Sequence, residues 1–293
     1  MSKSLFFSSF IIKILGLVFM VCDHIGLALA AFFPYDMNAI QVSNVLRGFG
    51  RLALPLFIFM IVEGVIHTRN FLKYFLRLGI MAVIISIALV IMGETNIFSS
   101  SMIKDAGNIF MDLTLGAVGI YCLKHKNRYI KLLAVLPLGF GIASTLVASY
   151  VHTHGGQIYW LPYFFRTQYG WFGIALIYAF YFGFFVTRLY LRNHAKQMDV
   201  EETVFEGTTV EKSAINIVDV ILLIAVSAGF IISLDYIPFN IVDEQIWCVL
   251  TGALLLLYNG KRGYNKKWFE YGCYLYYPVH IAILGLIFYL INL

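Results

Sequence analysis

The sequence predicts an all-α integral membrane protein, a polytopic helical bundle of about nine transmembrane helices. Of its 293 residues, 60% are hydrophobic and 13% are charged, and the mean hydropathy is +0.81. A soluble domain carries about 25% charged residues. The apolar residues form long runs, and no polar interval between them is long enough to bury a core of its own. We therefore expect a single transmembrane domain over residues 1–293.

Nine apolar segments follow one another, each near the length of about 20 residues with which a helix crosses a bilayer. We expect the spans near 10–33, 48–66, 72–92, 108–123, 130–151, 168–191, 215–234, 246–260 and 270–291. The interval 93–109 carries the weakest pattern. A short re-entrant or amphipathic helix in this interval would change the number of helices.

The basic residues predict the orientation, because lysine and arginine are retained on the cytoplasmic side of a membrane. All of the 21 lysines and arginines except Arg47, Arg51, Lys104 and Arg166 fall on one side of the nine spans. We expect this side to be cytoplasmic and to hold the N-terminus, and the odd number of spans places the C-terminus outside. The acidic segment 193–213 is then a cytoplasmic polar loop.

Several function classes have no support in the sequence. The cysteines at 22, 122, 248 and 273 form no CxxC pair, so we expect neither a metal site nor a disulfide framework. No P-loop, GxSxG, HExxH or dinucleotide-binding motif is present. We expect no nucleic-acid partner.

Two histidines inside apolar spans indicate a first candidate site, because ionisable groups are costly in a bilayer and usually functional there. His24 lies in the outer half of the first span. Its imidazole, with an ordinary pKa of about 6.5, can take up and return a proton at neutral pH. The alternative is a histidine that only hydrogen-bonds a neighbouring helix. His280 follows Pro278, whose kink frees backbone groups beside it, so we expect His24 and His280 to belong to a catalytic site.

Three charged residues, Asp23, Arg47 and Arg51, complete this outer group. Neighbouring residues on a helix point about 100° apart, so Asp23 is not expected to orient His24. Asp23 is expected to pair with Arg47 or Arg51 instead. The two arginines lie four residues apart on one helix face and can neutralise Asp23 or hold an anionic group by forked hydrogen bonds. Alternatively, both reach out to the lipid headgroups.

A second group lies at the cytoplasmic end of the second span and at the start of the third. Its members are Glu63, His67, Thr68, Arg69, Asn70, Lys73 and Arg77. The three basic residues recur every four positions and can bind the phosphates of a cytoplasmic cofactor. The hydroxyl and amide groups supply further hydrogen bonds. The alternatives are contact with anionic lipids for the basic residues and a structural ion pair for Glu63 with His67.

The motifs in both groups resemble those of the TraX family. The elements that carry the resemblance are DHIG at 23–26, RGFGR at 47–51, EGVIHTRN at 63–70, NIFMDLTLG at 108–116 and YPVH at 277–280. They extend over nearly the whole chain. The resemblance implies an acyltransferase of the bacterial inner membrane, like the acetylase that caps the N-terminus of F-type pilin. It also implies acetyl-CoA as the cytoplasmic acyl donor, with its phosphates on the second group and His24 as the base.

We therefore expect transfer of an acetyl group to an acceptor amine or hydroxyl at the extracytoplasmic face. The acceptor can be an exported peptide or pilin, a glycan or a lipid, and membrane lipids surround the protein. A secondary transporter of a small anionic solute is the main alternative, since it would use the same buried arginines and histidines. Such transporters commonly contain internal repeats, and none is visible in this sequence. A structural subunit whose buried charges only pair with one another is a third possibility.

Overall fold

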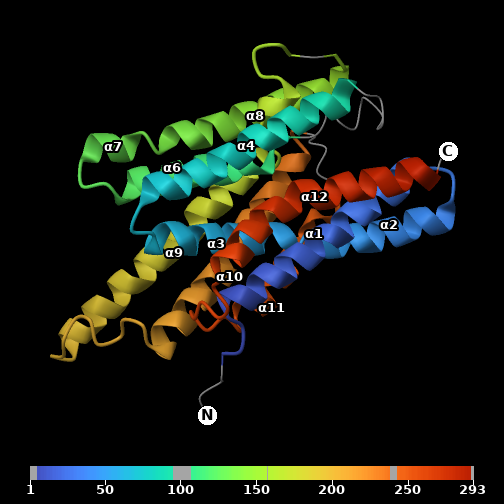
Figure 1. The fold of residues 1–293 in the computed structure, drawn as a ribbon. Helices are drawn as coiled ribbons and strands as arrows, with labels where there is room; N and C mark the ends of the chain where they lie inside the picture. The colour runs from blue at the N-terminus through green and yellow to red at the C-terminus, as the bar shows by residue number, and fades with distance from the viewer. Residues whose placement is uncertain (1–4, 95–106, 157, 238–242, 292–293) are drawn as a thin grey trace.

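The computed structural model describes residues 5–94, 107–156, 158–237 and 243–291. Within these ranges the chain is helical, with two isolated β-bridges and no strand (Figure 1). The helices are α1 Ser9–Phe32, α2 Met37–Gly50, α3 Ala53–His67, α4 Phe71–Glu94, α6 Ile109–Lys124, α7 Arg128–Leu132, α8 Val135–His154, η1 Tyr163–Phe165, α9 Gly170–Gln197, α10 Thr209–Leu234, η2 Asp243–Leu250, α11 Thr251–Leu255 and α12 Lys267–Ile291.

Each of the nine predicted spans coincides with helical structure. Six helical stretches among the described residues are long and apolar enough to cross a membrane, with α2 and α3 taken as one stretch and α7 and α8 as another. This supports the prediction of an all-helical membrane protein. The number of nine spans and the cytoplasmic N-terminus stay predictions.

Three boundaries differ from the expected ones. The second span was expected over 48–66, but helix begins at Met37 and continues to His67, interrupted by a turn at residues 51–52. In the segment expected as a loop over 193–213, α9 extends to Gln197 and α10 begins at Thr209, so the connection is limited to 198–208. Most of the uncertain interval 93–109 lies outside the described residues.

Polar side chains mark the starts of five helices. Ser8, Asp36, Asn108, Asn127 and Thr208 each accept a hydrogen bond from a backbone N–H group in the first turn that follows. The first N–H groups of a helix have no partner within the helix, and such caps satisfy them. The sequence therefore fixes these boundaries locally, even though the rest of each helix is apolar.

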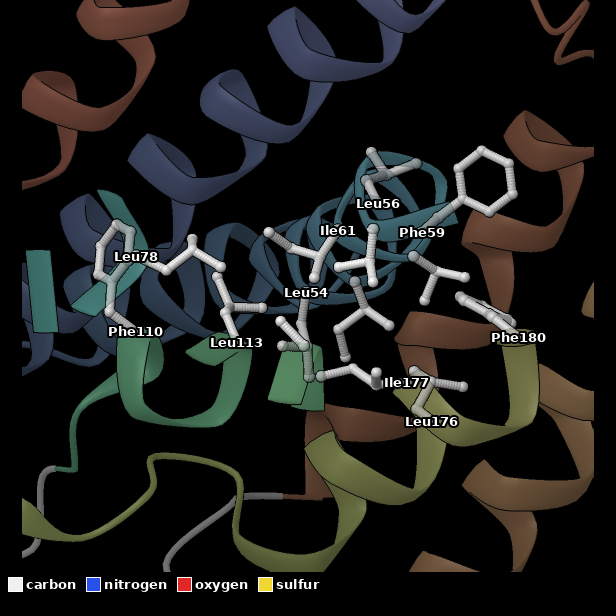
Figure 2. Packing of buried hydrophobic residues seen from close by; sticks show 14 of the residues in the cluster. Leu54, Leu56, Phe59, Ile61, Leu78, Phe110, Leu113, Leu176, Ile177 and Phe180 are labelled. Atoms are coloured by element: carbon white, nitrogen blue, oxygen red, sulfur yellow. The ribbon is translucent and has the colours of Figure 1, made fainter. Parts of the chain in front are cut away.

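Helix α3 forms the centre of the bundle. Among the most apolar 18 residues in the stretch of α2 and α3, 67% are buried inside the bundle. The corresponding share for α1 is 22%. The α3 side chains Leu54, Phe59 and Ile61 pack in one cluster with Leu113 of α6 and with Leu176, Ile177 and Phe180 of α9 (Figure 2). Such helices associate in lipid mainly through close packing, because lipid is as apolar as the side chains. The outer helices expose their apolar faces.

The segments that carry most of the basic residues meet at one end of the bundle, here called the basic end. Contacts between them are Phe7 N to Leu257 O at 2.9 Å, Lys212 Nζ to Glu63 Oε1 at 3.5 Å, Lys124 Nζ to Val65 O at 3.0 Å, and Arg77 Nη1 to Glu270 Oε2 at 3.9 Å. These contacts agree with the alternation of basic and non-basic connections in the sequence. Figure 1 shows α9 and α10 extending together beyond the other helices at this end.

Candidate functional site

Two histidines from opposite ends of the chain meet in the bundle. Nδ1 of His24 on α1 lies 2.8 Å from Nε2 of His280 on α12, and the ring centroids are 4.8 Å apart. The other ring nitrogen of His280, Nδ1, lies 2.7 Å from the carbonyl oxygen of Tyr276, one turn earlier on α12. His280 is 6% exposed. The pair therefore forms a continuous hydrogen-bonded chain from the α12 backbone to His24.

Asp23, the neighbour of His24 on α1, faces α2 instead. Its Oδ1 atom lies 2.9 Å from Nη2 of Arg51, and the Arg51 side chain is buried. This is the pairing predicted from the helical divergence of residues 23 and 24. The carboxylate thus neutralises a buried guanidinium and leaves His24 to its contact with α12.

Small residues bring α1 and α2 close together around this ion pair. A Cβ atom at Gly50 would lie 2.6 Å from the Cα atom of Asp23, and one at Gly26 would lie 2.8 Å from Cγ of Arg47. The hydroxyl of Ser43 donates a hydrogen bond to the carbonyl oxygen of Gly26 at 2.7 Å. The spacing of the two helices, and with it the position of both arginines, depends on these glycines.

Two tyrosines also belong to this group. The ring of Tyr277 on α12 lies 6.0 Å from that of His24 and 5.7 Å from that of His280, edge to face. Tyr169 lies within electrostatic range of Arg51 and Asp23. Its position before Gly170, at the start of the sixth predicted span, was the signal in the sequence.

Asp112 of α6 holds the backbone that carries Tyr169. Its carboxylate is fully buried and accepts hydrogen bonds from the backbone N–H groups of Gln168, at 2.7 Å, and Tyr169, at 3.2 Å. These groups precede the first turn of α9, where a negative charge is favoured by the helix dipole. A Cβ atom at Gly173 would lie 2.7 Å from the same carboxylate. Asp112 is therefore a structural clamp beside the site.

The histidine site lies deep in the bundle, far from the basic end. His24 lies 15 residues beyond Ser9, which is about 22 Å along α1 at 1.5 Å per residue. Ser9 itself contacts the basic end, since its hydroxyl lies 3.0 Å from that of Tyr258. Any molecule that reaches His24 from the basic end must therefore extend across most of a bilayer's apolar core, which is about 30 Å thick.

The second predicted group divides into two networks at the basic end. Glu63 contacts the hydroxyl of Tyr258 at 3.2 Å, Lys212 at 3.5 Å and the ring of His67 at 3.7 Å. Arg77 instead contacts Glu270 of α12. Nothing local in the sequence indicates Lys212, Tyr258 or Glu270 as partners, because each comes from a distant segment.

The remaining members of this group lie in the turn before α4 and, for Lys73, in the first turn of α4 itself. Asn70 accepts a hydrogen bond from the Lys73 backbone N–H at 3.0 Å, and the Thr68 hydroxyl donates to the carbonyl oxygen of Asn70 at 3.3 Å. The side chains of Thr68 and Asn70 thus shape the turn. The side chains of Arg69 and Lys73 are exposed.

A cleft of about 250 Å³ lies between α4, α8 and the segment before α9, at the end opposite the basic end. Its lining includes Glu94, Tyr163, Phe164 and Arg166. The wall formed by this segment is held by hydrogen bonds to α4, such as the part-buried one from the Ser86 hydroxyl to the Phe164 carbonyl at 2.6 Å. The same segment continues to Tyr169, so it links the cleft to the histidine site.

The apolar helices and the ionisable groups buried among them define a polytopic membrane protein. Residues 8–288 match the family described as TraX protein, and the chain belongs to this family. The chain is also similar to a protein of Dichelobacter nodosus described as probable fimbrial assembly protein FimC, serogroup H1. The two are 23% identical over an alignment of 293 positions, and this alignment covers 97% of each chain. No solved structure matches the chain.

Proposed function

We propose that this protein is a membrane-bound acyltransferase of the bacterial cytoplasmic membrane. It moves an acetyl group from cytoplasmic acetyl-CoA to an amine or hydroxyl at the outer face. The observation that carries the proposal is the imidazole of His24, hydrogen-bonded to His280 and set beside the ion pair of Asp23 with the buried Arg51. A base, a buried positive charge and depth within the membrane are what acyl transfer between the two faces requires.

The chemistry is a direct transfer with His24 as proton carrier. The acceptor nitrogen or oxygen attacks the thioester carbon, a new C–N or C–O bond forms, and His24 takes the acceptor proton. The carbonyl oxygen becomes an oxyanion, which Arg51 and Arg47 stabilise as hydrogen-bond donors. The intermediate then collapses, the C–S bond breaks, and the CoA thiolate takes the proton back from His24. The products are the acetylated acceptor and CoA, and His24 is restored.

Acetyl-CoA is the donor substrate, and the basic end supplies cations for its phosphates. Arg69 and Lys73 are exposed there, and Arg77 is half-buried one turn further along α4. Thr68 and Asn70 shape the turn that presents these residues. Glu63 is occupied with Lys212 and Tyr258, and a carboxylate repels phosphate, so we assign the phosphate contacts to the three basic side chains of α4 and its preceding turn.

An exported peptide or pilin subunit is the acceptor class that we propose. The Dichelobacter nodosus relative is described as a probable fimbrial assembly protein, and a fimbria is built from exported protein subunits. The cleft at the expected outer end of the bundle could hold such a subunit. Tyr163 gives its lining an aromatic side chain, and Glu94 and Arg166 give it one negative and one positive charge. Glycans and lipids are the other acceptor classes, and a competition assay with peptide, glycan and lipid acceptors would rank them.

Labelled acetyl-CoA tests the proposal directly in proteoliposomes. Label should appear on an added acceptor with wild type and be lost with His24→Ala. Label trapped on the protein without acceptor would indicate a two-step route through an acetyl-histidine. The transporter alternative predicts flux of a labelled anion without acetyl-CoA, and such flux without any acetyl transfer would overturn the proposal.

A further inference from the structure

We propose that His280 is a positioning residue that fixes His24 in one tautomer, with its Nε2 atom unprotonated and available as the base. The inference rests on the proposed function for its catalytic meaning. Its structural content, the position of two hydrogen atoms, can be measured without any assay of acyl transfer. The observation that carries it is the chain of two short contacts from the Tyr276 carbonyl through His280 to His24.

The assignment begins at the α12 backbone. A carbonyl oxygen only accepts hydrogen bonds, so the 2.7 Å contact between Tyr276 O and His280 Nδ1 requires a hydrogen on Nδ1. A neutral imidazole carries one ring hydrogen, and Nε2 of His280 is then an acceptor. The Tyr276 carbonyl therefore determines which nitrogen of His280 is protonated.

The second contact carries this assignment to α1. Nε2 of His280, as an acceptor, requires a hydrogen on Nδ1 of His24 across the 2.8 Å contact. Neutral His24 then has a lone pair on Nε2. The opposite tautomer of His24 would set two lone pairs against each other at this distance, which is repulsive. One tautomer of the pair is consistent with both contacts.

Aromatic contacts along α12 hold the His280 ring in the orientation that this chain needs. The ring of Tyr276 stacks on that of His280, with centroids 5.2 Å apart and planes 17° from parallel. Tyr277 contacts the same ring edge to face at 5.7 Å. Both tyrosines lie beside Pro278, the proline inside α12. The ring is thus fixed by its own helix before it meets α1.

The arrangement has a consequence for the proton that His24 would carry. When Nε2 of His24 accepts a proton, the imidazolium keeps its Nδ1–H bond to a neutral acceptor, which stabilises the positive charge. Asp23 cannot take this role, because it faces Arg51 on the other side of α1. His280 therefore occupies the place that a carboxylate holds in a Ser-His-Asp triad.

The decisive experiment is ¹⁵N NMR of the full chain with ¹⁵N-labelled histidine, in nanodiscs at a pH where both histidines are neutral. The His24 and His280 signals are assigned by their loss in His24→Gln and His280→Gln. We expect both residues as the Nδ1–H tautomer. Detection of His24 mainly as the Nε2–H tautomer would overturn the inference, whether or not acetyl transfer is observed.

Two variants of His280 test the positioning role in turnover. His280→Ala removes the acceptor that lies on Nδ1 of His24, so it should raise the share of the Nε2–H tautomer and lower kcat about 10²-fold, with the KM for acetyl-CoA unchanged. His280→Gln, whose side-chain oxygen can accept from His24 Nδ1–H, should recover most of this loss. His194→Gln, at an exposed histidine on α9, serves as the control with wild-type kcat. Equal losses in the Ala and Gln variants with an unchanged His24 tautomer would contradict the inference. Absence of transfer in wild type would contradict the proposed function, while the NMR result would still decide the tautomer.

Discussion

Gly50 of α2 lies directly against Asp23 of α1: a Cβ atom at Gly50 would overlap the Asp23 side chain and lie 2.6 Å from its Cα atom. The contact falls beside the ion pair of Asp23 with Arg51 and one residue from His24. The close approach of the two helices is therefore part of the geometry of the site. Substitutions at this contact should change the site as well as the stability.

Gly50→Ala should force α2 away from α1, because the Asp23 backbone cannot move out of the way. We expect a loss of about 1–3 kcal/mol in the free energy of unfolding, typical of overpacking, and a loss of activity that exceeds the loss of folded protein. Thermal unfolding in detergent and acetyl transfer measure the two effects. Gly139→Ala on α8, where a Cβ would meet nothing within 4 Å, is the matched control and should behave as wild type.

The ion pair of Asp23 with Arg51 should show strong coupling in a double-mutant cycle. Arg51→Ala leaves the half-buried Asp23 carboxylate without its cation and should cost about 3 kcal/mol, the lower end of the range for removing one partner of a buried pair. The double variant Asp23→Ala with Arg51→Ala should cost less than the sum of the two single variants. Unfolding measured for all four proteins gives the coupling. Additive effects would show that the two side chains do not depend on each other.

Loss of the Asp112 carboxylate should lower the free energy of unfolding more than loss of an exposed carboxylate that accepts two backbone hydrogen bonds. Asp112→Ala removes the acceptor for two backbone N–H groups in a buried place, and we expect a loss of about 3 kcal/mol. Asp36 accepts from the N–H groups of Asn38 and Ala39 at an exposed helix start, so Asp36→Ala should cost about 1 kcal/mol. Hydrogen exchange at residues 168–170 should rise in the first variant and stay unchanged in the second. Equal costs for the two variants would contradict the clamp.

Arg69→Ala and Lys73→Ala should weaken acetyl-CoA binding, by about tenfold when combined, since each removes one cation from the phosphate site. The effect should be smaller at high salt, because both side chains are exposed. Lys131→Ala on α7, at the same basic end, is a control that changes the charge as much as either single variant and should leave Kd unchanged. If Lys131→Ala weakens binding as much, the basic end acts only through its total charge.

Much of the fold can be predicted from the sequence, because each membrane-spanning helix requires a long apolar segment. All nine predicted segments coincide with helical structure, and helix divergence alone separates Asp23 from His24. The early start of α2 at Met37 was missed, because residues 37–47 include polar side chains that lower the hydropathy of this segment. The cap at Asp36 was the available signal.

The partners in the site could be predicted only in part. His24 and His280 are 256 residues apart, so their residue types indicate function but nothing local indicates that they meet. Glu63 was grouped with Arg69 and Arg77 because they are near in sequence. In the structure Glu63 contacts Lys212 and Tyr258, since the helical rotation within α3 directs it toward other segments. Contacts of this kind depend on how the helices pack, which a single sequence does not specify.

The most direct test of the proposed acetyl transfer uses labelled acetyl-CoA and purified protein in proteoliposomes, with wild type and His24→Gln compared and His194→Gln as the control. We expect all three proteins to bind acetyl-CoA, and only wild type and His194→Gln to transfer the acetyl group to an exported peptide acceptor. Equal transfer by His24→Gln, or a failure of wild type to bind acetyl-CoA, would contradict the proposal.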